Sequence, residues 1–369
     1  MSDIYLVSNH RKPMRKLPMP TIQINRRTVG TGHPAYIIAE VSANHNQDFD
    51  QAKRIIEAAK EAGADAVKLQ TYTPDTLTID CNNAYFQIKG TLWEGRNLYQ
   101  LYQEAYTPWE WHPKLQQIAL DLGLDFFSTP FDATAVAFLE TLRVPAYKVA
   151  SFENGDIPLL KEIAKTGKPV IMSTGLATLG EIDEAVQTLK TAGTNQLILL
   201  KCTSAYPAPP EEANLRTIRH LSETFGAPAG LSDHTLGISV PVAAVVLGAC
   251  VIEKHLTFSR NIPGPDSAFS LEPDEFKAMV DAIRTAEKAM GTVTYAIGPK
   301  QAESRAFRRS LFAVENIPQG AVFTRQNVRS IRPGYGLHPR YLEQIIGQCA
   351  TTTIHRGTPL EWSHVGPVS

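Results

Sequence analysis

Short apolar runs rich in β-branched residues alternate with longer amphipathic runs from residue 35 to residue 290. Such alternation is typical of a parallel β-sheet with crossover helices, because parallel neighbours cannot be joined by a tight turn. The number of apolar runs then selects the fold. We expect strands at residues 35–41, 66–72, 125–130, 146–151, 169–175, 197–204, 228–235 and 250–257.

The segments between these runs have helical periodicity. In 49–63, Ala52, Ile55 and Ala59 recur at helical spacing, and Gly63 stands where a helix C-cap is expected. Similar patterns cover 132–142, 179–193 and 272–291. Eight strand–helix units match the order and the size, about 250 residues, of an α/β TIM barrel, (β/α)8. A doubly wound open sheet is the alternative, and no GxGxxG motif follows the first strand to favour it.

The periodicity ends after the last helical segment. We expect a linker at 291–307 and a small β-rich domain at 308–369, where short β runs are punctuated by Pro and Gly. The barrel domain is expected over 21–290, after a flexible tail at 1–20. An insertion at 73–108 is too long for an ordinary βα loop, and such loops lie over the end of a barrel where sites usually form.

Charge and cysteine content exclude several classes of protein. Lys and Arg number 36 against 37 Asp and Glu, so a nucleic-acid partner is not expected. No membrane span or secretory signal is expected, because the first basic cluster follows its apolar stretch and Pro241 and Gly248 interrupt the most apolar region. Four cysteines without CxxC spacing predict free thiols and a cytoplasmic protein.

Three lysines stand inside apolar strand runs, near the carboxyl ends of the strands: Lys68, Lys148 and Lys201. A buried ammonium group is costly unless an opposite charge meets it. The lysines therefore predict an anionic ligand, such as one with phosphate and carboxylate groups, at the mouth of the barrel. The alternative is that each lysine pairs with a protein carboxylate or reaches solvent between helices.

Two histidines end the last two expected strands. His234 shares a strand face with Ser232, and His255 shares one with Glu253, so the imidazoles could meet at one metal ion. Without cysteine, such a site favours Mn²⁺, Mg²⁺, Fe²⁺, Co²⁺ or Zn²⁺ completed by oxygen ligands. A hydrogen-bonded histidine pair without metal is the alternative.

Other polar groups are expected at the same end of the barrel. Glu40 closes the first strand, Gln70 shares a face with Lys68, and Ser151 and Glu153 follow the fourth strand. Glu153 is the candidate proton carrier. Asn44, His45 and Asn46 follow the first strand and could lie at this end of the barrel, or they could equally be turn and N-cap residues for the next helix. We expect surface or capping roles for His10, His33, His112, His220, His338, His355 and His364.

Motifs throughout the chain, taken in order, resemble the sialic acid synthase (N-acetylneuraminate synthase) family. They are AEVSANHN, DAVKLQT, STPFD, YKVAS, LKCTSAYPAP, GLSDHTLG, ACVIEKHLT and GPDSAFSLEPDEF. The segment from RRSLFAVENI to IRPGYGLHP is similar to the C-terminal antifreeze-like (SAF) domain of that family. The resemblance implies a TIM barrel followed by a β-clip SAF domain.

Within the family, KLQTYTPDTLTID, the GTLWEGRNLYQLYQEAYTPWEWHP insertion and KVASFENGDIPLL resemble the pseudaminic acid synthases. The resemblance implies that phosphoenolpyruvate, water and 2,4-diacetamido-2,4,6-trideoxy-L-altrose give pseudaminic acid and phosphate. N-acetylneuraminate or legionaminate synthesis is the alternative, and RNIPGPDSAFS carries the GPD of the neuraminate branch. A Schiff-base lyase using Lys148 or Lys201 is a distant alternative. Another alternative is a protein without catalytic activity that only binds a sugar or a partner.

The resemblance also implies roles for individual residues. His234 and His255 would hold the divalent metal, with Mn²⁺ as the first candidate and Mg²⁺ or Co²⁺ as others. Glu40, Lys68, Lys148 and Glu153 would be catalytic. Arg332 would reach the sugar from the partner subunit of a domain-swapped homodimer. The substrate-binding set would be Gln70, Thr129, Ser151, Ser173, Ser204, Tyr206, Ser232, Glu253, Asp266 and Arg332.

Overall fold

Eight parallel strands form a closed barrel in the computed structural model, which describes residues 21–367. The strands are β3 Tyr36–Glu40, β4 Ala66–Thr71, β5 Asp125–Pro130, β6 Tyr147–Val149, β7 Val170–Ser173, β8 Leu197–Cys202, β9 Ala229–Asp233 and β10 Val251–His255. They follow chain order, and β10 pairs back onto β3 from Val251↔Tyr36 to His255↔Glu40. This closure confirms the predicted TIM barrel and excludes the open sheet. The predicted tail at 1–20 lies outside the described residues.

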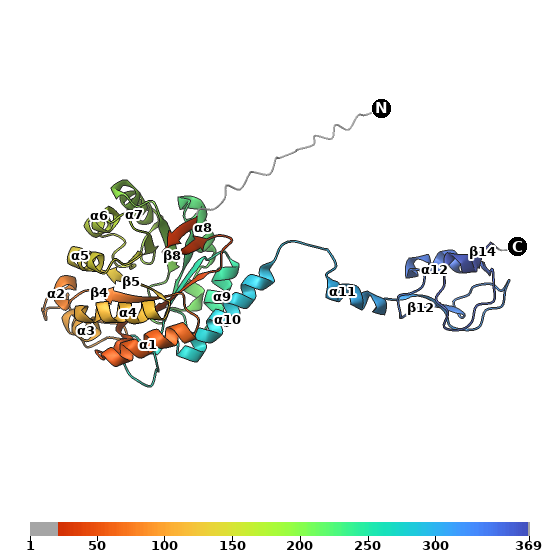
Figure 1. The fold of residues 1–369 in the computed structure, drawn as a ribbon, viewed down its shortest axis with the longest axis horizontal. Coiled ribbons are helices and arrows are strands. Elements are labelled where there is room, and N and C mark those ends of the chain that lie inside the picture. The colour runs from red at the N-terminus through yellow and green to blue at the C-terminus, as the bar shows by residue number, and fades with distance from the viewer. Residues whose placement is uncertain (1–20, 368–369) are drawn as a thin grey trace, which may run out of the picture. The chain divides into compact units, whose positions relative to one another are not determined.

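Helices surround the barrel, as Figure 1 shows. They are α1 Phe49–Glu61, α4 His112–Asp121, α5 Ala133–Thr141, α6 Ile157–Lys165, α7 Leu179–Ala192, α8 Arg216–Phe225, α9 Ser239–Val246 and α10 Pro273–Met290, while α2 Pro74–Leu77 and α3 Leu98–Ala105 lie in the segment between β4 and α4. Helix α1 begins where the Asp48 side chain accepts a hydrogen bond from the Gln51 N–H, and its Ile55 face is buried. It ends before Gly63, whose φ of 87° favours glycine. The four predicted helical segments are confirmed.

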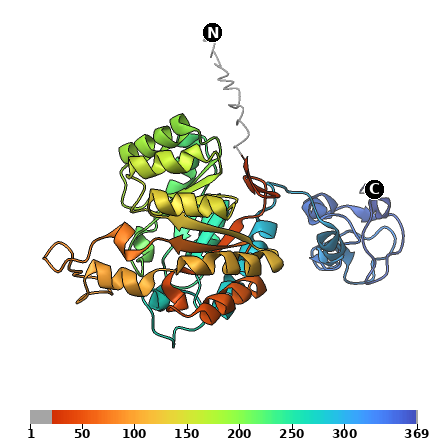
Figure 2. The same ribbon diagram turned by 60° about the vertical axis from the view of Figure 1, so that its left-hand side comes forward.

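The insertion between β4 and α4 carries α2 and α3. In Figure 2 it projects from the side of the barrel as an orange loop with short helices. Helix α3 is held by a capping box, in which Asn97 accepts from the Gln100 N–H and the Gln100 side chain accepts from the Asn97 N–H. Before α3, the Trp93 indole N–H donates to the Pro265 carbonyl at 2.9 Å. These contacts give the insertion a defined structure and attach it to the segment after β10.

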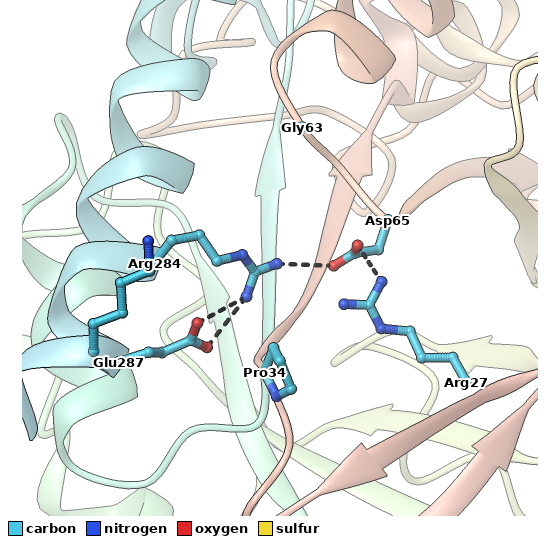
Figure 3. A pocket seen from close by; sticks show the side chains of 7 residues that line it. Arg27, Pro34, Gly63, Asp65, Arg284 and Glu287 are labelled. Carbon is cyan, nitrogen blue, oxygen red and sulfur yellow. Dashed lines mark hydrogen bonds and ion pairs between the residues drawn. The ribbon is translucent and has the colours of Figure 1, made fainter. Parts of the chain in front are cut away.

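An ion-pair network lies at the amino ends of the barrel strands, beside the hairpin of β1 Thr21–Ile24 and β2 Arg27–Gly30. Figure 3 shows Asp65 between Arg27 and Arg284, with Arg284 also paired with Glu287. One Asp65 oxygen additionally accepts from the Ile37 N–H at 2.9 Å. Asp65 therefore connects the hairpin, strand β3 and helix α10.

We expect Asp65→Asn to lower the free energy of unfolding by about 2–3 kcal/mol, because the amide loses charge-assisted bonds at a largely buried position. Denaturant unfolding measures the change. Asp281→Asn is the matched control, since Asp281 forms an exposed pair with Lys277 in α10 and should change stability by less than about 0.5 kcal/mol. Equal effects of the two substitutions would contradict the role given to Asp65.

The described chain divides into two compact units between Gly291 and Thr292. The second unit contains α11 Pro299–Ser304, β11 Ser310–Ala313, β12 Val328–Ile331, α12 Leu342–Ile345, β13 Cys349–Ala350 and β14 Val365–Gly366. Its own small core includes Leu311, Phe323, Ile345 and Leu360. The expected linker at 291–307 thus contains a short helix, which its charged sequence did not reveal. Among residues 21–367, no helix has the length and apolarity needed to cross a membrane.

Candidate active site

Four buried charged side chains form a cluster inside the barrel. The Lys68 ammonium group lies 2.8 Å from Glu40 and 3.5 Å from Glu253, and the Lys148 ammonium group lies 3.6 Å from Glu253. Glu253 therefore stands between the two lysines. The alternative in which these lysines pair with protein carboxylates is what the structure shows, and the pairs lie where the sequence predicted an anion site.

The cluster shifts the ionisation of each member. Burial alone would raise the pKa of Glu253, but Lys148 and Lys68 hold it below its usual value. Burial raises the pKa of Glu40 to about 7 against the opposing effect of Lys68. At neutral pH, Glu40 is therefore partly protonated. Burial lowers the pKa of Lys148, whereas Glu253 and Glu40 hold the pKa of Lys68 above its usual value against burial. An anion that enters the cluster meets the Lys68 ammonium group beside a partly protonated Glu40.

Lys201 does not belong to this cluster, so the prediction that it lies at the barrel mouth is wrong. Its ammonium group donates to the Cys202 carbonyl and to the Thr203 hydroxyl, at 2.9 and 3.2 Å. Side chains alternate along a strand, and on β8 it is Cys202 that points inward, with its sulfur 3.8 Å from His234 Nδ1. Cys202 was missed, although its spacing of two from Ser204 was the signal that could have found it.

Hydroxyl groups surround the two lysines. Lys68 donates to Thr129 at 3.2 Å, and Lys148 donates to Ser173 at 2.8 Å. Ser232 donates to Glu253 at 2.9 Å. The predicted hydroxyl-bearing residues of strands β5, β7 and β9 are thus brought to the cluster, as the sequence led us to expect.

Gly175 separates two further predicted serines. A Cβ atom at this position would lie 2.4 Å from the Ser204 hydroxyl and 2.6 Å from the Ser151 hydroxyl. The Gly175 N–H itself donates to Ser151 at 3.2 Å. Glycine therefore leaves room for both hydroxyls beside the barrel mouth, and a backbone N–H faces the same space.

His234 and His255 lie together, with ring centroids 5.3 Å apart. His234 Nδ1 is 3.0 Å from the Thr203 carbonyl, which fixes the N–H there and leaves Nε2 free to bind a metal. His255 Nδ1 is buried and has no hydrogen-bond partner. Burial and neighbouring His234 hold the pKa of His255 well below its usual range, so its imidazole is neutral, as a ligand must be. Against burial, Cys202 holds the pKa of His234 above its usual value, so a divalent ion bound by this pair would displace a proton from His234. The closeness of the two rings suits one divalent ion.

No group of three or more His, Cys, Asp or Glu side chains suited to a metal occurs within residues 21–367. A divalent ion bound by His234 and His255 would have these two imidazoles as its protein ligands, and water or substrate oxygens would complete the coordination. Asp266 lies nearby, with one oxygen 4.0 Å from His255 Nδ1. That oxygen also accepts from Ser42, which keeps the Asp266 carboxyl oriented toward the histidine.

A cavity of about 530 Å³ opens beside these groups. Gln70, Glu153, Tyr206, His255 and Asp266 line it. One Glu153 carboxyl oxygen is buried without a hydrogen-bond partner, and burial raises the pKa of Glu153 to about 7. A carboxyl group with this pKa can exchange protons near neutral pH, as a general acid or base requires.

The aromatic and amide side chains of the cavity are held in place. The Tyr206 ring lies 4.5 Å from the His234 ring and 5.7 Å from the Trp93 ring, centroid to centroid. The Gln70 amide donates to Glu40 at 3.1 Å and to Ser42 at 2.9 Å. Apart from Lys201, the structure thus brings the predicted lysines, carboxylates, hydroxyls and histidines of the barrel unit to one end of the barrel.

Arg332 lies in the second unit, directly after β12, and its predicted contact with the sugar stays a prediction. The expectation of a surface or capping role for His112 is wrong. His112 is fully buried, its Nε2 lies 2.9 Å from the Thr71 hydroxyl, and burial lowers its pKa to about 4. His45, also buried, contacts Thr107 at 3.0 Å, so both histidines hold the end of the insertion rather than face the cavity.

Comparisons with known proteins agree with this geometry. The model of the NeuB family matches residues 55–295, and that of the SAF domain matches residues 308–366. The chain belongs to the NeuB family. The family assignment predicted from the motifs is thus confirmed, and the chain is a phosphoenolpyruvate-dependent nonulosonic acid synthase. Enzymes of the NeuB family generally use a divalent metal ion.

Curated relatives of this NeuB-family chain include synthases for different sugars. Pseudaminic acid synthase of Helicobacter pylori is 46% identical over 89% of this chain and 96% of its own length. N,N'-diacetyllegionaminic acid synthase of Legionella pneumophila is 38% identical over 91% of this chain and 96% of its own.

Solved structures are also similar. N-acetylneuraminic acid synthetase of Leptospira borgpetersenii, solved with citrate, has a TM-score of 0.69 at 31% identity, covering 78% of this chain and 95% of that one. The spore coat polysaccharide biosynthesis protein SpsE of Bacillus subtilis has a TM-score of 0.65 at 35% identity, covering 94% and 99%.

Proposed function

We propose that this NeuB-family chain is a pseudaminic acid synthase. It would condense phosphoenolpyruvate and water with 2,4-diacetamido-2,4,6-trideoxy-L-altrose to give pseudaminic acid and phosphate. The supporting observation is the identity of 46% to the pseudaminic acid synthases of Helicobacter pylori and Campylobacter jejuni, against 38–40% to two legionaminic acid synthases. Legionaminate synthesis is the second candidate, since those relatives match a similar share of the chain.

Phosphoenolpyruvate would bind at the cluster inside the barrel. Its negative charge suits Lys68 and Lys148, which Glu253 and Glu40 neutralise only in part when Glu40 is protonated. Hydroxyl groups would accept or donate the remaining hydrogen bonds. They belong to Thr129, Ser151, Ser173, Ser204 and Ser232.

The sugar would occupy the cavity, with its aldehyde toward His255 and its other groups toward Gln70, Tyr206 and Asp266. A divalent ion held by His234 and His255, Mn²⁺ as the first candidate, would polarise the aldehyde. C3 of phosphoenolpyruvate would then attack the aldehyde carbon. Water would add at C2, and Glu153 would pass one proton of that water to the former aldehyde oxygen, which becomes a hydroxyl group. The C2–O bond to phosphate would then break, the C2 hydroxyl would become the keto group, and its proton would leave with phosphate.

The proposal includes a domain-swapped homodimer in the cytoplasm. Arg332 of the second unit would then complete the sugar site of the partner barrel, as the resemblance implies. The boundaries proposed for the barrel, linker and SAF domains are 21–290, 291–307 and 308–369. The Schiff-base alternative loses one of its two candidate nucleophiles, because Lys201 points out of the barrel.

Phosphate release by the purified chain tests this function. The altrose compound, N-acetylmannosamine and the diacetamido sugar used for legionaminate would each be supplied with phosphoenolpyruvate and Mn²⁺. We expect the highest kcat/KM with the altrose compound and no turnover after chelation of metal. Turnover of either other sugar with none of the altrose compound would reject the assignment.

A further inference from the structure

A buried ion pair lies next to the two candidate metal ligands, on the other face of the same strands. Asp233 precedes His234 on β9, Lys254 precedes His255 on β10, and the two charged residues are opposite each other in the strand register. The Lys254 ammonium group contacts the Asp233 carboxylate, and the two side chains are 0% and 2% exposed. Because side chains alternate along a strand, this pair points out of the barrel while the histidines point inward.

The pair also holds the backbone on both sides of His234. Asp233 accepts hydrogen bonds from the Thr235 N–H at 3.1 Å and from the Thr235 hydroxyl at 3.0 Å. The Lys254 ammonium group donates to the Thr235 carbonyl at 2.5 Å as well as to Asp233. The residues before and after His234 are therefore both bound, through one ammonium group, to the residue that precedes His255. The two strand ends that carry the histidines cannot separate without breaking these bonds.

The stability of the fold does not by itself explain charged residues at these positions. Burying an ammonium group and a carboxylate costs several kcal/mol for each ion, and well-packed apolar side chains of similar volume often stabilise a fold equally well. Helix α9, which packs over β9 and β10, has the apolar sequence SVPVAAVV, so apolar residues would suit this layer. The ion pair instead provides directional bonds of defined length between the two strand ends.

A metal site depends on such defined positions, because each imidazole nitrogen must lie about 2.0–2.2 Å from the same ion. We infer that Lys254 and Asp233 are positioning residues, which keep His234 and His255 at the separation that one divalent ion requires. This inference rests on the metal site of the proposed function. Neither Lys254 nor Asp233 lines the cavity, so they act through the strand ends and not on the substrate. Residues that orient metal ligands typically contribute about 10- to 100-fold to metal affinity.

The double substitution Lys254→Met with Asp233→Asn tests the inference without leaving an unpaired buried charge. The Asn amide oxygen can still accept from the Thr235 N–H, so this variant loses chiefly the bonds of the ammonium group. We expect the Mn²⁺ dissociation constant, measured by electron paramagnetic resonance titration of the free ion, to rise by about 10- to 100-fold. Saturating Mn²⁺ should restore kcat to within about threefold of the parental value, because both imidazoles are still present.

Two further substitutions separate positioning from stability. Asp233→Asn alone is the milder variant, and should raise the Mn²⁺ dissociation constant by about 3- to 10-fold, since the ammonium group then binds a neutral oxygen. Asp65→Asn is the matched control, because it removes ion pairs at the amino ends of the strands, away from the histidines. It should lower the free energy of unfolding and leave Mn²⁺ affinity at the parental value. Circular dichroism would establish which variants fold.

The outcomes distinguish this inference from the proposed function. Weaker Mn²⁺ binding in the folded Asp233 variants, with parental binding in Asp65→Asn, supports the inference. Parental Mn²⁺ affinity in every Asp233 variant that folds, or an equal loss of affinity in Asp65→Asn, overturns the inference while leaving the metal site intact. Absence of Mn²⁺ binding by the parent protein overturns the metal site of the proposed function, and this inference with it.

Discussion

Replacing His255 with Ala should lower kcat/KM by about 10³-fold or more. A metal that polarises a carbonyl contributes several kcal/mol to the transition state, and about 1.4 kcal/mol corresponds to a tenfold change in rate. The proposed metal site has two imidazoles, 5.3 Å apart between ring centroids, so removing one would leave a single protein ligand. The variant should also lose tight Mn²⁺ binding, measured by electron paramagnetic resonance titration of the free ion.

His220→Ala is the matched control for His255→Ala, because His220 is exposed on helix α8. It should keep parental turnover and metal affinity. Circular dichroism would establish that the His255 variant is folded. Parental turnover together with parental Mn²⁺ affinity in folded His255→Ala would remove the metal site from the proposal.

Glu153→Gln should lower kcat by about 10²- to 10³-fold, the usual contribution of a general base. Burial raises the pKa of Glu153 to about 7, so the ionised base forms as pH rises through neutrality. At saturating phosphoenolpyruvate, the parental kcat should therefore increase with pH around 7, and the variant should lack this increase. A pH–rate profile of both proteins, with phosphate release as the signal, measures the difference.

Glu153→Gln should lower activity but raise the free energy of unfolding at alkaline pH. The pKa of Glu153 is higher in the folded state than in the unfolded state, so its contribution to stability is complete below about pH 4.5 and is lost as pH rises through about 7. Glutamine stays neutral, and the variant should be more stable than the parent at about pH 8. Glu162→Gln, at an exposed pair with Lys165, should change neither profile. A variant with the parental pH–rate profile would exclude Glu153 as the base.

Much of the barrel could be predicted from local patterns. Alternating strands and helices are determined by residues close in sequence, so all eight strands were found. Their ends were less accurate: 146–151 was expected and Tyr147–Val149 is observed, because hydrogen bonding to the neighbours decides where a strand ends. The sequence also left uncertain which strand residues point into the barrel and which point outward. Lys201 was assigned to the mouth, but its register opposite Leu231 places it outside and Cys202 inside.

The sequence by itself determined the order of the barrel strands, the chemical groups near their carboxyl ends and the family resemblance. The tertiary structure decided that Glu253 stands between Lys68 and Lys148, and that the insertion walls the cavity. The physical reason is the separation of the interacting residues along the chain. Strand and helix patterns repeat over a few residues, whereas side chains far apart in sequence come into contact only when the barrel closes. The bond from Trp93 to Pro265 joins positions 172 residues apart, a distance no local pattern specifies.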